Sequence, residues 1–486
     1  MLIGKEGAEA GGIKSVWVMG ECQISCNAKK GAYPGEWHGW QSLGAGQATG
    51  EDQLTNQTAT IKNTSKNTSV FESKDPLGLP TASTLKVITS ITALDILGED
   101  YRFKTSLSYQ GEIDESGTLK GNIIITGNGD PSLGSERFEQ TKRNTILKQW
   151  VAKIKEAGIK EVQGRIIGDD SRYDGYQAPG GYSWSDLGNY YGAGLSSLNW
   201  EENKIGVNFK PSSIGQQAEI NSLSPGYEYL QIINKVTTGR KGTGDQVYGF
   251  LAPYSNLIFL RGSYATDLKK TIEVSSPDPA LAVAHALTSE LEKNSISVSG
   301  VPSTSTLLAS SHELDLKNTH LLDEHFSPLL GELVHWFNKK SINLYGEALL
   351  MAVGKFTNPN SSHSNAARLM QKYWNQKLNI PSHQLNIYDG SGLSQQNRVT
   401  TSAMTAIMAY AKTKDWYATF YESLPVINGI HMKSGTIGGV LGYTGYYQLK
   451  NGEHIAFSLL VNNYSGGASA MRQKMFNLLN TLKNYW

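Results

Sequence analysis

A serine and a lysine stand three residues apart in Ser83-Thr84-Leu85-Lys86, the only Ser-x-x-Lys in the chain. Positions i and i+3 of a helix share one face, so the hydroxyl and the amine can meet. A serine hydroxyl is a poor nucleophile without a base beside it, and a lysine whose pKa is lowered can be that base. N–H groups at a helix start can also stabilise an oxyanion. The alternative interpretation is a serine near a helix cap and a solvated lysine.

A second polar pair is Ser341-Ile342-Asn343. The Ser-x-Asn pattern occurs four times in the chain, so the triplet alone is a weak signal. Its setting is more informative, because it lies between two apolar helical stretches. A polar pair is unexpected there unless it has a function. The alternative is a turn between helices that Ser341 caps.

A cation, a hydroxyl and a glycine follow one another in Lys433-Ser434-Gly435-Thr436, the only Lys-[Ser/Thr]-Gly of the chain. The segment follows a β-like run around 430–432. On a strand edge these residue types can hold a substrate carboxylate, and glycine permits close approach of the backbone to a ligand. The alternative is a surface turn with a solvated lysine.

The first motif is expected at the start of a buried helix. Val87, Ile91 and Leu94 recur at helical spacing, Pro80 precedes them and Gly98 follows. Proline before a helix and glycine after it are ordinary start and stop signals. The sequence therefore predicts a helix over about 80–98 whose apolar stripe faces a core.

Other segments of the chain also show the sequence patterns of helices or of strands. Residues 365–376, 401–412 and 468–483 predict helices. The strongest hairpin signal is a pair of β-like runs on either side of Asn451-Gly452, and a polar hairpin is expected with its turn at Ser65–Thr68.

The residue pattern in the middle of the chain is mainly that of short strands and turns. From about 106 to 315, short β-like runs alternate with Gly, Pro, Asn and Ser, and helical stretches occur near 138–157 and 278–293. We expect an irregular segment over 1–50, one discontinuous catalytic domain over 51–105 and 316–486, and one or two β-rich modules inserted over 106–315.

Composition excludes several classes. The 44 Lys and Arg against 43 Asp and Glu give a net charge of +1, which argues against binding of nucleic acid. No apolar run is long enough for a transmembrane segment. The only cysteines, Cys22 and Cys26, and the absence of an HExxH among ten histidines predict no metal site and no cofactor. The N-terminus shows no signal peptide.

Taken in order along the chain, the three motifs resemble those of the penicilloyl-serine transferase superfamily. Ser83 and Ser341 are 258 residues apart, and this excess coincides with the β-rich stretch. An insertion there resembles the class C low-molecular-mass penicillin-binding proteins of the penicillin-binding protein 4 type, a D-Ala-D-Ala carboxypeptidase/endopeptidase family. The segments 127–133, 164–175, 338–347 and 389–394 are similar to it as well.

The resemblance implies a fold and a set of roles. The fold would be α/β (α+β), with an antiparallel sheet flanked by helices and β-rich inserted domains. Ser83 would be the acylated nucleophile and Lys86 its general base. Ser341 would carry a proton to the leaving amine, and Asn343 would hold the substrate backbone. Lys433 would assist the proton relay and bind the terminal carboxylate.

Further implications concern the substrate and its surroundings. The hydroxyls of Ser434 and Thr436 would share the carboxylate with the lysine, Gly435 would lie between them, and the N–H groups of Ser83 and Thr436 would form the oxyanion hole. The substrates would be peptidoglycan stem peptides and the covalent inhibitors β-lactam antibiotics, at a periplasmic or other extracytoplasmic location. No cofactor is implied.

Two departures and two alternatives stay open. The family commonly follows DGSGLS with a basic residue, where this chain has Gln395, and residues 1–50 match nothing in the family. A β-lactamase or esterase on the same scaffold is one alternative. A cell-wall-binding or β-lactam-sensing protein with little turnover is the other.

Two segments are open to more than one interpretation. Asp130, in GNGDPSL, is expected to be a turn residue rather than a ligand. The Tyr- and Trp-rich stretch 182–200 could line a cleft or pack as an interdomain aromatic cluster.

Overall fold

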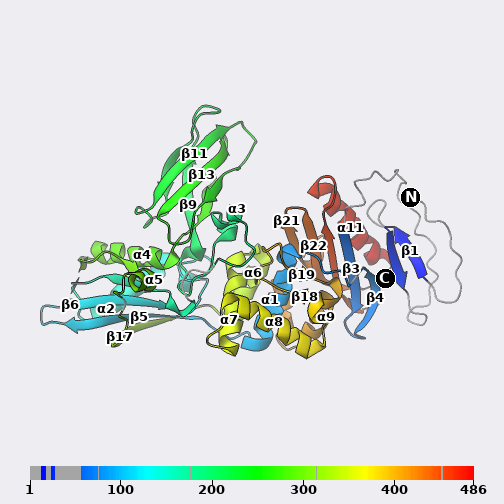
Figure 1. Cartoon of the computed structure of the whole chain (residues 1–486), viewed down its shortest axis with the longest axis horizontal. Coiled ribbons are helices and arrows are strands. Elements are labelled where there is room, and N and C mark those ends of the chain that lie inside the picture. Colours follow the sequence, from blue (N-terminus) through cyan, green and yellow to red (C-terminus); the bar gives the residue numbers. More distant parts are fainter. Residues whose placement is uncertain are drawn as a thin grey trace. The chain divides into compact units, whose positions relative to one another are not determined.

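A computed structural model describes residues 13–17, 23–27, 56–74, 76–173, 178–313, 315–449 and 452–485 (Figure 1). Its residues fall into two compact units. The first comprises Met1–Glu99, Val334–Ser341 and Val353–Trp486, and the second comprises Asp100–Leu333 and Ile342–Ala352. The functional division of the chain at about residues 105 and 316 stays a prediction.

A six-stranded antiparallel sheet forms the centre of the first unit, in the order β20-β21-β22-β23-β3-β4. The strands are β3 (Asn56–Asn63), β4 (Thr68–Ser73), β20 (Val426–Ile427), β21 (Ile430–Ile437), β22 (Val440–Gln448) and β23 (His454–Asn462). The predicted hairpins correspond to β3–β4 and β22–β23. Of the predicted turn residues, Asn451 lies outside the described residues.

Helices cover both faces of this sheet. They are α1 (Lys86–Leu97), α8 (His363–Leu378), α9 (Thr401–Ala411), α10 (Tyr417–Ser423) and α11 (Ala468–Tyr485), with the short 3-10 helix η2 (Ala82–Leu85) directly before α1. A small ribbon, β18 (Leu385–Asn386) with β19 (Arg398–Val399), completes the unit.

The pleat of the strands separates the two faces. Along β23, Phe457 and Leu459 belong to one apolar cluster with Met475 of α11. Thr60 of β3, on the other face, forms a hydrogen bond of 2.8 Å with Thr401 at the start of α9. Side chains alternate between faces with period two, so each strand serves both helical layers. The prediction of an antiparallel sheet between helices is confirmed.

Helix α1 is buried all round, as its sequence predicts. Val87, Ile88 and Ile91 have no exposed surface, and neither does Lys86 at its first position. Gly98 ends the helix with a φ of 83°. A helix buried on every side has one orientation only, which fixes the direction of the side chains at its N-terminal end.

Two helices flank the second motif. They are α6 (Leu330–Lys340) and α7 (Asn343–Thr357), and Ser341 lies in the turn between them with a φ of 57°. A non-glycine residue in the left-handed region costs about 1–3 kcal/mol and persists only where its surroundings hold it there. The predicted position of Ser341 between two helices is confirmed.

The described residues of the second unit form three sheets. The largest comprises β5 (Lys104–Ile113), β6 (Thr118–Gly127), β7 (Glu161–Val162), β8 (Ile166–Asp169), β15 (Ser297–Val298), β16 (Ser303–Thr304) and β17 (Thr319–Phe326). The helices of the second unit include α2 (Arg143–Glu156), α3 (Trp184–Leu187), α4 (Pro279–Lys293) and α5 (Ser305–Ser310). The predicted helices near 138–157 and 278–293 are α2 and α4.

Two three-stranded sheets make up the rest of this unit. One has the order β10-β9-β14, from β9 (Lys204–Lys210), β10 (Glu219–Leu223) and β14 (Ile272–Ser275). The other has the order β11-β13-β12, from β11 (Gln231–Gly239), β12 (Tyr248–Phe250) and β13 (Leu257–Ala265). The β-rich texture predicted for the middle of the chain is confirmed.

The N-terminal segment is described only in part. Strands β1 (Ile13–Trp17) and β2 (Gln23–Asn27) pair antiparallel. The expectation of an irregular segment over 1–50 otherwise falls outside the described residues, as do Cys22 and the side chain of Cys26. Among the helices that are described, none combines the length and the apolar character needed to cross a membrane.

Candidate active site

The first motif brings a hydroxyl and an amine together at the junction of η2 and α1. The Lys86 Nζ lies 2.9 Å from the Ser83 Oγ. It also donates to the carbonyl oxygen of Ser391, at 2.6 Å, and lies 5.8 Å from the centroid of the Phe337 ring. Lys86 is fully buried. A proton can therefore pass directly between Ser83 and Lys86, as the i, i+3 spacing predicts.

The loop over residues 389–394, which the sequence marks only by its resemblance to the family, holds Lys86 in place. The buried carboxylate of Asp389 accepts hydrogen bonds from the backbone N–H of Gly392 at 2.9 Å and of Ser394 at 2.6 Å, and from Asn397 Nδ2 at 2.9 Å. These contacts fix the carbonyl of Ser391, the acceptor for Lys86. The D-G-S-G pattern is a signal for an Asx-type turn and could have identified this loop.

Strand β21 approaches Ser83 closely because it carries a glycine. A Cβ added at Gly435 would lie 2.6 Å from the Thr81 oxygen, 2.9 Å from the Thr84 nitrogen and 3.0 Å from the Ser83 nitrogen. A Cβ atom does not approach another heavy atom to less than 3.0 Å in real structures, so a side chain at this position would push the strand away from η2. The prediction that Gly435 permits close backbone approach is consistent with this packing.

Lys433, two residues earlier on β21, is the second buried lysine of the site. Its Nζ donates to the Ser341 Oγ at 3.0 Å and to the carbonyl oxygen of Ser434 at 2.9 Å. Only 2% of its surface is exposed. Burial lowers the pKa of Lys433 to about 7, because desolvation disfavours the ammonium form. The amine can thus gain or lose a proton near neutral pH.

The outer edge of β21 is open beyond its short pairing with β20. The Met432 N–H donates to the Pro425 oxygen, on the side away from β22. Hydrogen-bonding directions alternate along an antiparallel strand, so the N–H groups of Ser434 and Thr436 point to the same side as that of Met432. Thr436 is exposed there. This edge can accept an extended peptide, with a backbone donor at Thr436.

Asn343 is described with the second unit, where it begins α7. Its Nδ2 donates to the carbonyl oxygen of Tyr191 at 2.7 Å. Its predicted role of holding the substrate backbone stays a prediction. Gln395 is exposed, and its carbonyl oxygen accepts a hydrogen bond of 2.5 Å from Arg398.

Asp130 is a turn residue, as the sequence predicts. Its Oδ1 accepts hydrogen bonds from the Ser132 N–H at 2.8 Å and the Ser132 Oγ at 2.6 Å. Burial raises its pKa to about 6. In the part of the chain that is described, no cluster of three or more His, Cys, Asp or Glu side chains could hold a metal ion.

Comparison with protein families gives a match over nearly the whole chain. The model of the D-Ala-D-Ala carboxypeptidase 3 (S13) family matches residues 46–484. The chain is also similar to a D-alanyl-D-alanine carboxypeptidase of Actinomadura sp. (strain R39), with 26% identity over 415 residues, which are 80% of this chain and 74% of that protein. The similarity to D-alanyl-D-alanine carboxypeptidase DacB of Haemophilus influenzae is 24% over 452 residues, 87% of this chain and 89% of that one.

The fold agrees with a solved structure. Penicillin-binding protein 4 (dacB) from Haemophilus influenzae superposes with a TM-score of 0.75 at 23% identity, covering 89% of this chain and 97% of that one. A second structure of that protein, complexed with a novel β-lactam, gives a TM-score of 0.70 at 23% identity, with 88% and 96% covered. The expected fold class, an α/β (α+β) arrangement of the penicilloyl-serine transferase type, is confirmed.

Proposed function

Because this chain belongs to the D-Ala-D-Ala carboxypeptidase 3 (S13) family and is a carboxypeptidase of that kind, we propose that it removes the terminal D-alanine of peptidoglycan stem peptides through an acyl-enzyme on Ser83. The observation that carries the proposal is the 2.9 Å contact between the Ser83 Oγ and the Nζ of the buried Lys86. Nucleophile and base within hydrogen-bond reach are the geometric requirement for covalent catalysis.

In the proposed acylation step, the Ser83 Oγ attacks the carbonyl carbon of the penultimate D-alanine and its proton passes to Lys86. The backbone N–H groups of Ser83 and Thr436 donate hydrogen bonds to the developing oxyanion, and these bonds strengthen in the transition state. The leaving amine receives a proton from the Ser341 Oγ, which lies 3.0 Å from the Lys433 Nζ. Water then hydrolyses the ester and releases Ser83.

Substrate binding is assigned to the open edge of β21. Lys433 would pair with the terminal carboxylate, and the hydroxyls of Ser434 and Thr436 would complete its contacts. Asn343 would hold the peptide backbone. The amide of a β-lactam presents the same carbonyl to the nucleophile, so these antibiotics would acylate Ser83 as inhibitors. Enzymes of this family act on the cell wall, outside the cytoplasm, and we place this chain in the periplasm or an equivalent compartment.

Amidation of the substrate's C-terminus tests the proposed carboxylate pocket. Removing the negative charge should lower kcat/KM about 10- to 100-fold, because a charge-assisted hydrogen bond contributes about 1.5–3 kcal/mol and 1.4 kcal/mol corresponds to about tenfold. The measurement compares steady-state kinetics on one D-Ala-D-Ala peptide with a free and an amidated C-terminus. Equal rates would exclude a carboxylate pocket at Lys433.

Substrate affinity should depend on pH through Lys433. Below about pH 7 the amine is protonated and can pair with the carboxylate, and above it the free site loses the proton. Affinity should therefore fall as pH rises, by about tenfold between pH 7 and 8.5. Calorimetric titration of a D-Ala-D-Ala peptide into the Ser83→Ala variant measures binding without turnover.

The amidated peptide is the control for this pH dependence. It has no charge to pair with Lys433, so its affinity should change little over the same range. A free-acid peptide whose affinity is flat from pH 6 to 9 would contradict the assignment of Lys433 as the carboxylate-binding group.

A further inference from the structure

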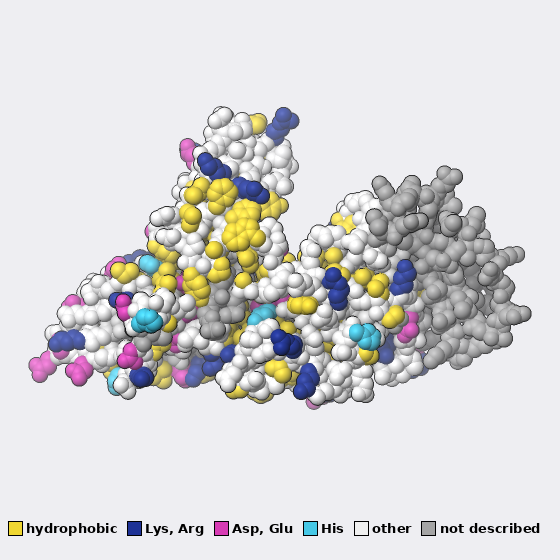
Figure 2. All heavy atoms as spheres, in the orientation of Figure 1, with side chains coloured by type: hydrophobic (Ala, Val, Ile, Leu, Met, Phe, Trp, Pro, Cys, Tyr) yellow, Lys and Arg dark blue, Asp and Glu magenta, His cyan; other side chains and the backbone are white. Residues whose placement is uncertain are grey.

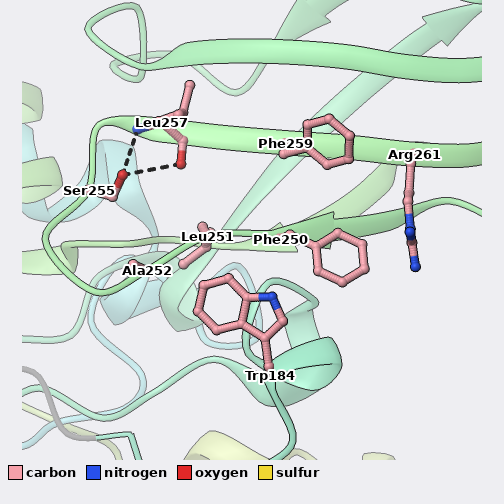
Figure 3. Close-up of a pocket in the computed structure, with 8 residues that line it drawn as sticks. All are labelled: Trp184, Phe250, Leu251, Ala252, Ser255, Leu257, Phe259 and Arg261. Carbon is pink, nitrogen blue, oxygen red and sulfur yellow. Dashed lines mark hydrogen bonds between the residues drawn. The ribbon is translucent and has the colours of Figure 1, made fainter.

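Residues 182–203 form an aromatic segment that contacts two parts of the second unit. Trp184, in α3, points toward Phe250 at an open hollow on the sheet of β11, β13 and β12 (Figure 3). Hydrophobic side chains gather over β11 and β13 (Figure 2). Other residues of the segment contact the start of α7, the helix that Asn343 begins. The contacts with α7 bear on the proposed reaction, because Asn343 is assigned to hold the substrate backbone.

Two hydrogen bonds join this segment to the first turn of α7. The Asn343 Nδ2 donates to the carbonyl oxygen of Tyr191 at 2.7 Å. The hydroxyl of Tyr345, a fully buried side chain, donates to the Glu202 Oε1 at 3.2 Å. The partners are 152 and 143 positions apart in the chain, so both bonds are tertiary contacts.

The first turn of a helix depends on such contacts more than the turns that follow. Its N–H groups have no partner within the helix, so its own hydrogen bonds hold it only in part. Tyr191 and Glu202 hold the side chains at the first and third positions of α7, which fixes the place of the turn and its rotation about the helix axis. An amide nitrogen carries two protons, and the bond to Tyr191 also orients the Asn343 carboxamide.

Glu202 is a rigid acceptor for Tyr345 because several groups hold its carboxylate. It accepts hydrogen bonds from the Ser135 Oγ at 2.8 Å and from the Arg137 Nε at 2.5 Å. The Lys204 Nζ lies 3.3 Å from its Oε2. Only 6% of Glu202 is exposed. A buried carboxylate between two cations keeps one orientation, since any other would leave buried charges unpaired.

The backbone at Glu202 is strained. Glu201, Glu202 and Asn203 have φ values of 51°, 56° and 52°, so three consecutive non-glycine residues lie in the left-handed region. L-residues visit this region singly, and they stay there only where their surroundings hold them. The Asn203 side chain does so here, with its Nδ2 donating to the Gly194 oxygen at 2.8 Å and its Oδ1 accepting from the Trp200 N–H at 3.0 Å. Backbone strain of this kind clusters at functional sites, which supports a role for the placement of Glu202.

We propose that Glu202 and Tyr345 are positioning residues for Asn343, and that they hold the start of α7 so that Asn343 can contact the substrate backbone. The inference rests on the proposed function, which assigns that contact to Asn343. Neither positioning residue is assigned a contact with substrate, and both act through the helix. Loss of the Tyr345 hydroxyl would weaken a contact made equally in the ground state and the transition state, so KM should change more than kcat.

Tyr345→Phe tests the inference, because it removes one oxygen atom and keeps the packing of the buried ring. We expect KM on a D-Ala-D-Ala peptide to rise about 3- to 10-fold. The value of kcat should change by less than about twofold. In the Asn343→Ala background the same substitution should have no further effect on KM, since both residues would act through one contact.

A second variant keeps the test independent of the folding of the first. The Tyr182 hydroxyl donates to the buried Glu347 Oε1 at 3.0 Å, in the next turn of α7. Tyr182→Phe removes this bond at a half-buried side chain. It should raise KM in the same Asn343-dependent way.

The matched control is Tyr264→Phe. Tyr264 is a buried tyrosine of the same unit, in β13, and its hydroxyl donates to the carbonyl oxygens of Leu268 at 3.0 Å and Lys270 at 3.1 Å. Its loss should lower the Tm and leave KM unchanged. Amide hydrogen exchange gives a readout that needs no substrate: Tyr345→Phe should speed exchange in a peptide covering residues 341–350, and Tyr264→Phe should not.

Three results would overturn the inference: an unchanged KM in Tyr345→Phe, the same rise in KM with and without the Asn343 side chain, or an equal rise in Tyr264→Phe. The inference and the proposed function fail separately. Penicillin acylation of Ser83 together with any of these results rejects only the positioning role. Faster exchange at the start of α7 in Tyr345→Phe, without acylation of Ser83 in the wild type, rejects only the proposed chemistry.

Discussion

Replacing Ser83 with alanine is expected to lower kcat on a D-Ala-D-Ala peptide by at least about 10⁴-fold. The Oγ is the atom proposed to form the acyl bond, and the variant removes it. The KM or Kd should change little, because the proposed carboxylate contacts of Lys433 remain. Steady-state kinetics with release of D-alanine as the readout measures both quantities.

Ser90→Ala is the matched control for this variant. Ser90 is a buried serine of α1, and its Oγ accepts a hydrogen bond of 3.0 Å from Asn338 Nδ2. Its loss should lower the free energy of unfolding by about 1–3 kcal/mol and leave kcat nearly unchanged. A Ser83→Ala enzyme that keeps more than a small fraction of wild-type kcat would show that another residue is the nucleophile.

Replacing Lys86 with methionine should slow acylation by penicillin about 10³- to 10⁴-fold at neutral pH. Methionine fills much of the same buried volume, so the variant removes the amine without leaving a large cavity. The carbonyl of Ser391 loses its donor, and the stability of the variant should fall for that reason. Stopped-flow measurement of the acylation rate separates this effect from deacylation.

Two further variants serve as controls for the effect of Lys86→Met. The double variant Ser83→Ala/Lys86→Met should be no less active than Ser83→Ala alone, because members of one catalytic unit are not additive. Lys104→Met, which removes a surface ion pair with Glu324, should acylate at the wild-type rate. Rapid acylation of Lys86→Met would contradict the role of this lysine as the base.

The sequence predicts the first motif well because its geometry is local. The i, i+3 spacing of Ser83 and Lys86 on a helix is enough to expect the contact that the structure shows, at 2.9 Å. The same holds for α1, for the hairpin β22–β23 and for the turn at Asp130. In each case the signal comes from residues within a few positions of one another.

Contacts between distant segments could not be predicted in this way. The donation from Lys86 to the carbonyl of Ser391 joins residues 305 positions apart, and a backbone acceptor has no signature in the side chains. The left-handed φ of Ser341 and the approach of Gly435 to Ser83 likewise depend on how the sheet packs on η2. The pattern of residue types along the chain does not predict which distant segments come into contact.

The aromatic stretch 182–200 shows the same limit. Trp184 lines an open hollow, whereas Trp200 is fully buried in the core of the second unit. The alternative of an interdomain aromatic cluster stays a prediction. The strand alternation in β13 could have indicated that Phe259 and Arg261 share a face. Which face is covered depends on the packing of the whole unit, and that information is absent from the local pattern.

The most direct test of the central claim is to locate the covalent adduct. The full-length enzyme is incubated with benzylpenicillin, digested and mapped by tandem mass spectrometry. We expect one penicilloyl group per chain, on the Oγ of Ser83, and no adduct on the Ser83→Ala variant. An adduct on another residue, or the same stoichiometry in the Ser83→Ala variant, would contradict it.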